Sequence, residues 1–264
     1  MVILTNPYGQ RSNNFFQHIH LDSFCKENGI SFYNPFLRAM YSDYPNLRNQ
    51  RQIEKVNSLI LFFKKTHILK LANTVHFNID NKDHQAKILT GKFLFCDGWL
   101  FRSFATTIKY RTYYQHLFNP NIDKQYFQDA YLKKTNADEV IIGVHIRRAD
   151  YKYFTNGIYY FNNSVYINKI QQLVTCLNTN NYKILLLSND NTLNIEEFKK
   201  NFKNVFISKE SETVDHFLMS KCDYIIGPPS TFSLWASYIG ETPFYHIKNT
   251  EDKISLDKFY VCNG

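Results

Sequence analysis

Two adjacent arginines, Arg147 and Arg148, directly follow a run of β-branched side chains in the stretch VIIGVHIRRADY, residues 140–151. A guanidinium is a permanent cation whose planar fork matches the oxygens of a phosphate or a carboxylate. One arginine at this position is easily explained by an ion pair with a nearby carboxylate such as Asp150. Two in a row are harder to explain in that way, so the pair predicts an anion site at the end of the strand.

A second polar group follows the apolar stretch DYIIG, residues 223–227. Ser230 and Thr231 come after two prolines and open the apolar sequence of an expected helix. Serine and threonine are common N-cap residues, so these hydroxyls can be plain caps. The same helix start also offers unpaired backbone N–H groups to a phosphate, and the two roles are compatible.

Asp215 lies early in the expected helix VDHFLMSKC, residues 214–222. An aspartate in the first turn usually stabilises the N-terminus of a helix. Its alternative role is to accept two hydrogen bonds from the edge of a guanine.

Two common nucleotide-site motifs are missing. The stretch GQRSNNFF, residues 9–16, has one glycine, so it is neither a P-loop nor a dinucleotide fingerprint. The sequence also lacks the D-x-D carboxylate pair that a Mg²⁺- or Mn²⁺-dependent sugar-nucleotide enzyme uses. We therefore expect neither a metal nor another cofactor.

The second half of the chain alternates between strands and helices, which predicts a parallel sheet with helices on both faces. The expected strands are residues 139–146, 182–190, 204–208, 223–229 and 242–247, and the expected helices are residues 165–177, 195–202, 214–222 and 230–240. Ligands of such sheets bind beyond the carboxyl ends of the strands. The arginine pair, Ser230 and Thr231 all follow strands, so this edge is where they should meet.

The first half has a looser pattern. Residues 1–6, 30–35 and 92–101 are expected strands, and residues 14–29, 47–70 and 103–135 are expected to be helical, with Gly29 as a helix stop. The pattern changes near residue 138, so we expect two domains, residues 1–138 and residues 139–264.

The composition favours a globular protein that binds anions. Of the 264 residues, 44% are hydrophobic, and the net charge of +8 attracts nucleotides, nucleic acid or an acidic membrane surface. The basic residues are scattered without a groove-reading motif, which argues against nucleic acid. Five widely spaced cysteines fit neither a disulfide framework nor a zinc site. We see no signal peptide and no spanning segment, so we expect a cytoplasmic protein, with peripheral membrane contact as a further option.

Several motifs together resemble a known enzyme family. HIRRADY, residues 145–151, looks like the H-x-R-R-x-D motif of the fucosyltransferase superfamily, and residues 214–240 resemble that superfamily's last motif. The stretch from Gly9 to Pro35 resembles the N-terminal G-x-x-G-N-x-x-F-Q-Y-A sequence of the α-1,2-fucosyltransferases of glycosyltransferase family 11. CDGWLFRSF, residues 96–104, is similar to their G-Y-F-Q-S segment. The chain departs from these patterns at Ser12, at Pro228-Pro229 and at Leu234.

The resemblance implies an α/β protein of the GT-B type, with two Rossmann-like lobes that face a cleft. Residues 1–138 would shape the acceptor side, and residues 139–264 would hold GDP-fucose. It implies an inverting, metal-independent transfer of fucose to a glycan hydroxyl, in an α-1,2 linkage. The implied donor-binding residues are His145, Arg147, Arg148, Asp215, Ser230, Thr231 and, in the first lobe, Asn13.

The resemblance assigns roles within this set. Arg147 and Arg148 would hold the diphosphate, with hydrogen bonds from Ser230 and Thr231, while His145 and Asp215 would contact the guanine. Arg147, Arg148 and Asp150 are the catalytic candidates, and Asp150 would either act as a base or orient an arginine. The base itself is left unassigned, and the first lobe offers three further carboxylates as candidates, Asp22, Asp43 and Asp97.

Three alternatives stay open. Residues that bind phosphate do not read the sugar, so GDP-mannose or another GDP-sugar can replace GDP-fucose as the donor. A non-catalytic relative would bind a glycan without transferring anything. A nucleic-acid-binding protein would lose affinity steeply with salt and ignore GDP. The expected partners are a GDP-sugar and an oligosaccharide acceptor, and the oligomeric state is not predicted.

Overall fold

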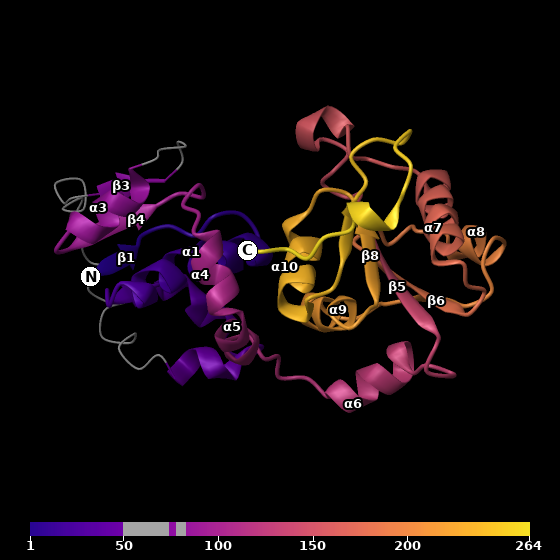
Figure 1. Cartoon of the computed structure of the whole chain (residues 1–264), viewed down its shortest axis with the longest axis horizontal. Coiled ribbons are helices and arrows are strands. Elements are labelled where there is room, and N and C mark those ends of the chain that lie inside the picture. Colours follow the sequence, from indigo (N-terminus) through magenta and orange to yellow (C-terminus); the bar gives the residue numbers. More distant parts are fainter. Residues whose placement is uncertain (50–73, 78–82) are drawn as a thin grey trace. The chain divides into compact units, whose positions relative to one another are not determined.

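The computed structural model describes residues 1–49, 74–77 and 83–264, and it divides the chain into two compact units (Figure 1). Unit 1 comprises Met1–Asn121 together with Asn263–Gly264, and unit 2 comprises Ile122–Cys262. The division falls before the sequence-based boundary near residue 138. The physical reason is that Ile122, Phe127 and Leu132 pack against the hydrophobic core of unit 2.

Unit 2 contains a five-stranded sheet in which every neighbouring pair is parallel, as the sequence predicted. The strand order is β7-β6-β5-β8-β9. The strands are β5 (Val140–Ile146), β6 (Tyr182–Ser188), β7 (Val205–Ile207), β8 (Tyr224–Gly227) and β9 (Phe244–His246).

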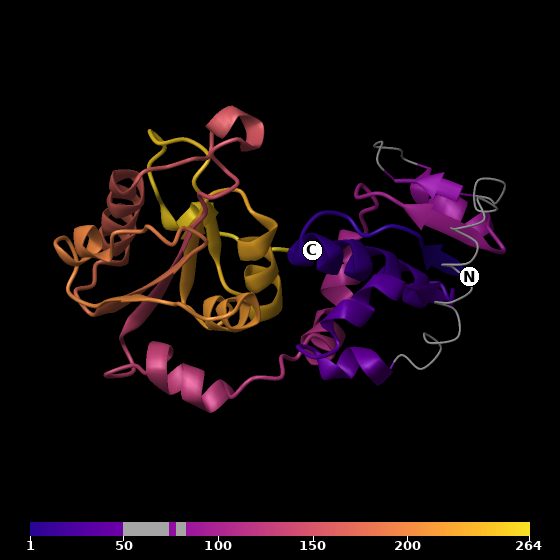
Figure 2. The same cartoon turned by 180° about the vertical axis from the view of Figure 1, so that it is seen from behind.

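Helices cover both faces of this sheet (Figure 1, Figure 2). They are α7 (Asn163–Leu177), α8 (Ile195–Lys199), α9 (Glu212–Met219) and α10 (Thr231–Gly240). Successive strand residues point to opposite faces. Accordingly, Ile142 and Val144 belong to the core under α7 and α8, whereas Ile141 belongs to the core under α9 and α10. This two-sided burial explains why the strands are apolar almost throughout.

Unit 1 has a smaller parallel sheet with the order β2-β1-β4-β3. Its strands are β1 (Val2–Leu4), β2 (Phe32–Tyr33), β3 (Thr74–His76) and β4 (Leu94–Asp97), and its α-helices are α1 (Arg11–Glu27), α3 (His84–Thr90), α4 (Phe104–Lys109) and α5 (Arg111–Leu117). Gly29 adopts a φ of +65° just after α1, which agrees with the predicted helix stop. β3 and α3 were not predicted.

The expected helix over residues 103–135 is replaced by several short helices. After α4 and α5, the chain forms α6 (Lys124–Phe127) and a π-helical turn, η4 (Gln128–Leu132). Short 3₁₀ helices elsewhere are η1 (Pro35–Met40), η2 (Pro45–Asn49), η5 (Phe154–Gly157) and η6 (Leu256–Lys258). Most of the expected helix over residues 47–70 lies outside the described residues. Within the described ranges, none of the helices has the length and apolar character needed to span a membrane.

Candidate active site

The strand order of unit 2 reverses at its centre. β5 and β8 are neighbours, but the chain runs from β5 outward to β6 and β7 before it returns to β8 on the other side. In open parallel sheets, ligands bind beyond the carboxyl ends of the strands at such a reversal. Arg147 directly follows β5, and Ser230 precedes the helix that follows β8, so both residues stand at this position.

Arg147 is held in a fixed orientation by side chains around it. Its Nη1 donates to Ser230 Oγ at 3.0 Å, and its Nε and Nη2 donate to the two carboxylate oxygens of Asp150 at 3.0 and 2.5 Å. The guanidinium lies 4.7 Å from the ring centroid of Tyr151. The arginine side chain is nevertheless 20% exposed. The result is an oriented cation that still reaches solvent.

Asp150 is paired with this arginine and is itself half exposed. The hydrogen bonds from Arg147 lower the pKa of Asp150, so the carboxylate is ionised at neutral pH. A carboxylate whose proton affinity is lowered in this way is a weak base. The geometry therefore favours the second of its two expected roles, in which it orients the arginine.

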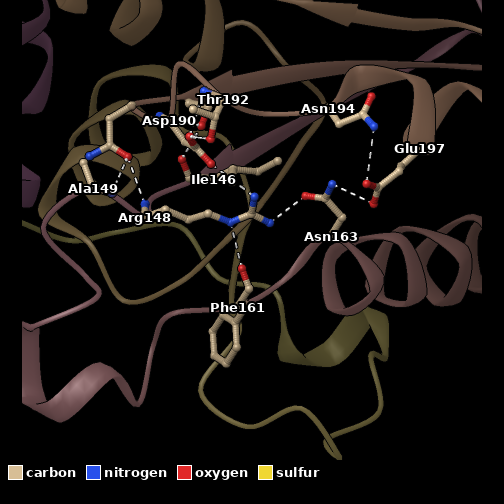
Figure 3. A network of polar contacts seen from close by, with 11 residues as sticks. Ile146, Arg148, Ala149, Phe161, Asn163, Asp190, Thr192, Asn194 and Glu197 are labelled. Carbon is tan, nitrogen blue, oxygen red and sulfur yellow. Dashed lines mark hydrogen bonds and ion pairs between the residues drawn. The ribbon is translucent and has the colours of Figure 1, made fainter.

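Arg148 points into a different network, drawn in Figure 3. Its Nε donates to the carbonyl of Phe161 at 2.9 Å, its Nη1 to Asp190 Oδ2 at 3.2 Å and its Nη2 to Asn163 Oδ1 at 2.6 Å. The side chain is only 11% exposed. Asn163 in turn donates to Glu197 at 2.8 Å. Every nitrogen of this guanidinium thus has a protein acceptor, and the network joins the end of β5 to the start of α7.

His145 lies on the buried side of the motif. Its Nδ1 is 2.6 Å from Ser233 Oγ, and its ring packs on Phe232 with a centroid distance of 4.8 Å. Phe232 stacks on its other neighbour, His216, at 4.1 Å. Burial, together with the positive charge of Arg147, lowers the pKa of His145 to about 3, so the imidazole is neutral at physiological pH.

Ser230 caps α10, as its sequence position suggested. Its side-chain oxygen accepts a hydrogen bond from the backbone N–H of Phe232 at 3.2 Å while it also accepts one from Arg147. Pro229 is held by a hydrogen bond that its carbonyl accepts from the Tyr151 hydroxyl. Thr231, the first residue of the helix, is half-buried. The capping and ligand-binding roles remain compatible, because the cap fixes the helix start beside Arg147.

Asp215 and Asn13, the remaining predicted site residues, belong to α9 and α1. Asp215 is in the first turn of α9 and accepts a hydrogen bond from Ser208, which follows β7. Burial, with added repulsion from Glu210 and Glu212, raises the pKa of Asp215 to about 7. Asn13 belongs to α1 in unit 1, where its amide lies so close to Gly9 that a Cβ there would be 2.1 Å from Asn13 Nδ2.

The structure adds residues that the sequence had not assigned. Tyr151 supports Arg147 and Pro229, and Asn163 and Asp190 fix Arg148. Tyr151 could have been suspected as the aromatic residue that ends the arginine motif. Asn163 comes 15 residues after Arg148, and nothing in its local sequence marks it as a partner. Among the described residues, no three His, Cys, Asp or Glu side chains are grouped so that they could hold a metal ion.

The comparisons with known proteins concern both family and fold. The model of glycosyl transferase family 11 matches residues 46–255. A search of curated proteins finds no significant match.

Several solved structures share the fold. A mutant of Arabidopsis thaliana FUT1 in complex with GDP is 12% identical, with 98% of this chain and 73% of that chain covered and a TM-score of 0.63. NodZ alpha-1,6-fucosyltransferase soaked with GDP-fucose is 13% identical, with coverage of 96% and 97% and a TM-score of 0.55. POFUT1 in complex with GDP-fucose is 10% identical, with coverage of 96% for both chains and a TM-score of 0.53. These similarities confirm the expected GT-B type of fold.

Proposed function

This chain belongs to glycosyl transferase family 11 and is therefore a glycosyltransferase, and from that premise we propose that it transfers fucose from GDP-fucose to a hydroxyl of a glycan acceptor. The transfer inverts the anomeric carbon, forms an α-1,2 linkage and uses no metal. Unit 2 binds the donor, and unit 1 contributes the acceptor side. The structures similar to this fold that contain GDP or GDP-fucose support the choice of donor.

The observation that carries the proposal is the fixed position of Arg147 at the reversal of the strand order. Departure of GDP places negative charge on the terminal phosphate while the sugar acquires positive charge. Because Asp150 and Ser230 already orient Arg147, its side chain needs little rearrangement to stabilise that charge. The first backbone N–H groups of α10 support the same phosphate.

The two arginines have different duties in this proposal. Arg147 contacts the diphosphate, because its side chain is oriented yet reaches solvent. Arg148 holds the loop after β5 in place through Asn163, Asp190 and the carbonyl of Phe161. Its contribution to phosphate binding is therefore indirect, and it is a positioning residue.

The experiment is thermal unfolding of the wild type and of Arg147→Ala with GDP, GDP-fucose, GDP-mannose or UDP, each in the presence of EDTA. A ligand at 100 times its Kd stabilises the native state by about 2.7 kcal/mol, which shifts the midpoint visibly. We expect shifts with GDP and GDP-fucose, no shift with UDP, and loss of both shifts in the variant. Lys203→Ala, an exposed change in unit 2, serves as the matched control and should keep them.

Two results would overturn parts of the proposal. Equal shifts with GDP-mannose and GDP-fucose, followed by turnover of GDP-mannose alone, would replace the donor. Absence of a shift with every nucleotide would remove the donor class altogether. Retention of the shifts in EDTA is the result expected for metal-independent donor binding.

A further inference from the structure

Polar residues at the carboxyl ends of three neighbouring strands of unit 1 contact one another. β3 ends at His76 and β4 at Asp97, and these two residues are direct partners in the register of the sheet. His76 Nδ1 lies 2.5 Å from Asp97 Oδ1. The other oxygen of Asp97 accepts a hydrogen bond from Asn6, which follows β1, at 3.1 Å. The carboxyl edge of this sheet thus carries a histidine oriented by an aspartate.

Exposure differs sharply within the pair. The side chain of His76 is 64% exposed, whereas that of Asp97 is 15% exposed. A carboxylate that accepts a hydrogen bond from Nδ1 keeps the proton of a neutral imidazole on that nitrogen. The lone pair of the neutral ring is then on Nε2. This is the arrangement of a general base that a buried carboxylate orients from behind.

Two other candidate bases in the described part of unit 1, Asp43 and Asp22, already accept hydrogen bonds from neighbouring side chains. Asp43 is paired with Arg11 at 2.6 Å, and Asp22 accepts a hydrogen bond from the Tyr114 hydroxyl at 2.7 Å. Three histidines of this unit, His18, His20 and His84, are buried. Among the described residues of unit 1, His76 is the one histidine that combines exposure with a carboxylate partner.

Two aromatic side chains follow β1 and β4, the central strands of this sheet. Tyr8 comes two residues after Asn6, and Trp99 comes two residues after Asp97. The two rings stack at a centroid distance of 5.3 Å and an interplanar angle of 15°, and Tyr8 remains 43% exposed. An exposed, rigid aromatic ring of this kind can pack against the C–H face of a pyranose while its hydroxyl forms hydrogen bonds.

We propose that His76 is the base that accepts the proton of the acceptor hydroxyl, that Asp97 positions it, and that Tyr8 packs against the acceptor sugar. This inference rests on the proposed function. In the transfer step the acceptor O–H proton moves to His76 Nε2, and the acceptor oxygen forms a bond to the anomeric carbon. The bond between that carbon and the phosphate oxygen breaks, and its electron pair leaves with GDP. The negative charge of Asp97 stabilises the resulting imidazolium.

The test compares His76→Ala, Asp97→Asn and the double variant with the wild type. The control is His116→Ala, an exposed histidine of α5. Calorimetry measures GDP binding, and GDP release from GDP-fucose is measured with lactose, with phenyl β-galactoside and with water alone as acceptor. We expect His76→Ala to bind GDP within twofold of wild type and to lose activity by a factor of about 10²–10⁴. Added imidazole should restore at least part of this loss, and His116→Ala should behave as wild type.

Asp97→Asn separates positioning from packing. We expect a loss by a factor of about 10–100 when it is made alone, and no further loss when it is added to His76→Ala, because its effect passes through the imidazole. Activity of His76→Ala within threefold of wild type would overturn the inference, and so would a loss that imidazole does not reverse. If the wild type neither binds GDP nor releases it from GDP-fucose, the proposed function itself fails, and the inference fails with it.

Discussion

At the scale of single residues, the two adjacent arginines illustrate how neighbours in sequence can differ in physical state. Arg147 is fixed by Asp150 and Ser230 but remains partly exposed, whereas Arg148 is nearly buried among acceptors. An oriented and accessible cation can bind a ligand without first breaking protein contacts. A buried cation contributes mainly to the conformation of the loop that contains it.

This difference predicts opposite outcomes for two substitutions. We expect Arg147→Ala to lower turnover of GDP-fucose by a factor of about 10²–10³ with little change in the free energy of unfolding. We expect Arg148→Ala to reduce that free energy by about 2–3 kcal/mol, because Asp190 and Asn163 each lose a partner. Urea unfolding and steady-state kinetics on both variants measure the two effects. A stable Arg148→Ala protein would show that its network contributes little.

Asp215 leads to a prediction for the pH dependence of donor binding. Burial raises the pKa of this carboxyl to about 7, so it gains a proton as the pH falls through neutrality. A carboxylate that accepts hydrogen bonds from guanine must be ionised. We therefore expect the affinity for GDP-fucose to increase between pH 6 and pH 8 and then to level off.

Calorimetric titration of GDP-fucose at several pH values tests this expectation. GDP-fucose suits the experiment better than GDP, because its diphosphate is a diester and does not itself titrate in this range. Asp215→Asn should bind more weakly at pH 8 and show no increase with pH. An unchanged pH profile in the variant would remove Asp215 from the guanine site.

At the scale of helices and strands, alternation in the sequence was sufficient for the sheet of unit 2 and the helices that cover it. The apolar runs around residues 140–146 and 182–188 are buried on both faces, and such strands are recognisable without knowledge of their neighbours. β3 has only three residues, and a strand that short gives no periodic pattern. The stretch over residues 103–135 has helical periodicity, but tertiary packing divides it between the two units, which local sequence does not report.

The candidate site was predictable to a similar depth. The carboxyl ends of β5 and β8 had to meet once the sheet was parallel, and this brings Arg147 close to Ser230. The direction of each guanidinium depends on acceptors elsewhere in the chain, such as Asn163 and Asp190. The His76–Asp97 pair depends in the same way on the register of two strands, one of which was not predicted.

Close packing between α10 and the end of α9 predicts a strong effect at Gly240. A Cβ at this position would lie 2.0 Å from the carbonyl oxygen of Ser220, which is backbone and cannot rotate away. We expect Gly240→Ala to reduce the free energy of unfolding by about 2–3 kcal/mol. Urea unfolding measures the change, with the exposed Lys203→Ala as a control. A loss below about 0.5 kcal/mol would mean that the two helices can separate at little cost.

At the scale of the whole molecule, four histidines link stability to pH. His18 and His20 are buried in unit 1, and His145 and the half-buried His246 belong to unit 2. Burial lowers the pKa of all four, to about 3 for His20 and His145 and to about 4 for His246. Unfolding exposes each imidazole and returns its pKa toward 6.5.

The sign of the effect follows from proton binding. Below pH 6.5 the unfolded state takes up protons that the folded state excludes, so stability decreases as the pH falls. In unit 1, His20 alone predicts a loss of about 1.5 kcal/mol between pH 6.5 and pH 5, and His18 adds to the loss in the same direction. In unit 2, Asp215 acts in the opposite direction, because its raised pKa lets the folded state bind a proton first as the pH falls. We therefore expect unit 2 to lose less stability than unit 1.

Amide hydrogen exchange with mass spectrometry reports the two units separately, because peptides from each sequence range are resolved and can be corrected for the intrinsic exchange rate. Peptides from unit 1 should lose protection more steeply than those from unit 2 between pH 6.5 and pH 5. In Asp215→Asn the proton uptake by residue 215 is absent, so the loss of protection in unit 2 should approach that in unit 1. Equal pH dependence of protection in the two units of the wild type would mean either that Asp215 is ionised throughout or that the two units unfold as one. The Asp215→Asn variant separates these cases. If the units unfold as one, the substitution changes the pH dependence of unit 1 as well; if Asp215 is ionised throughout, it does not.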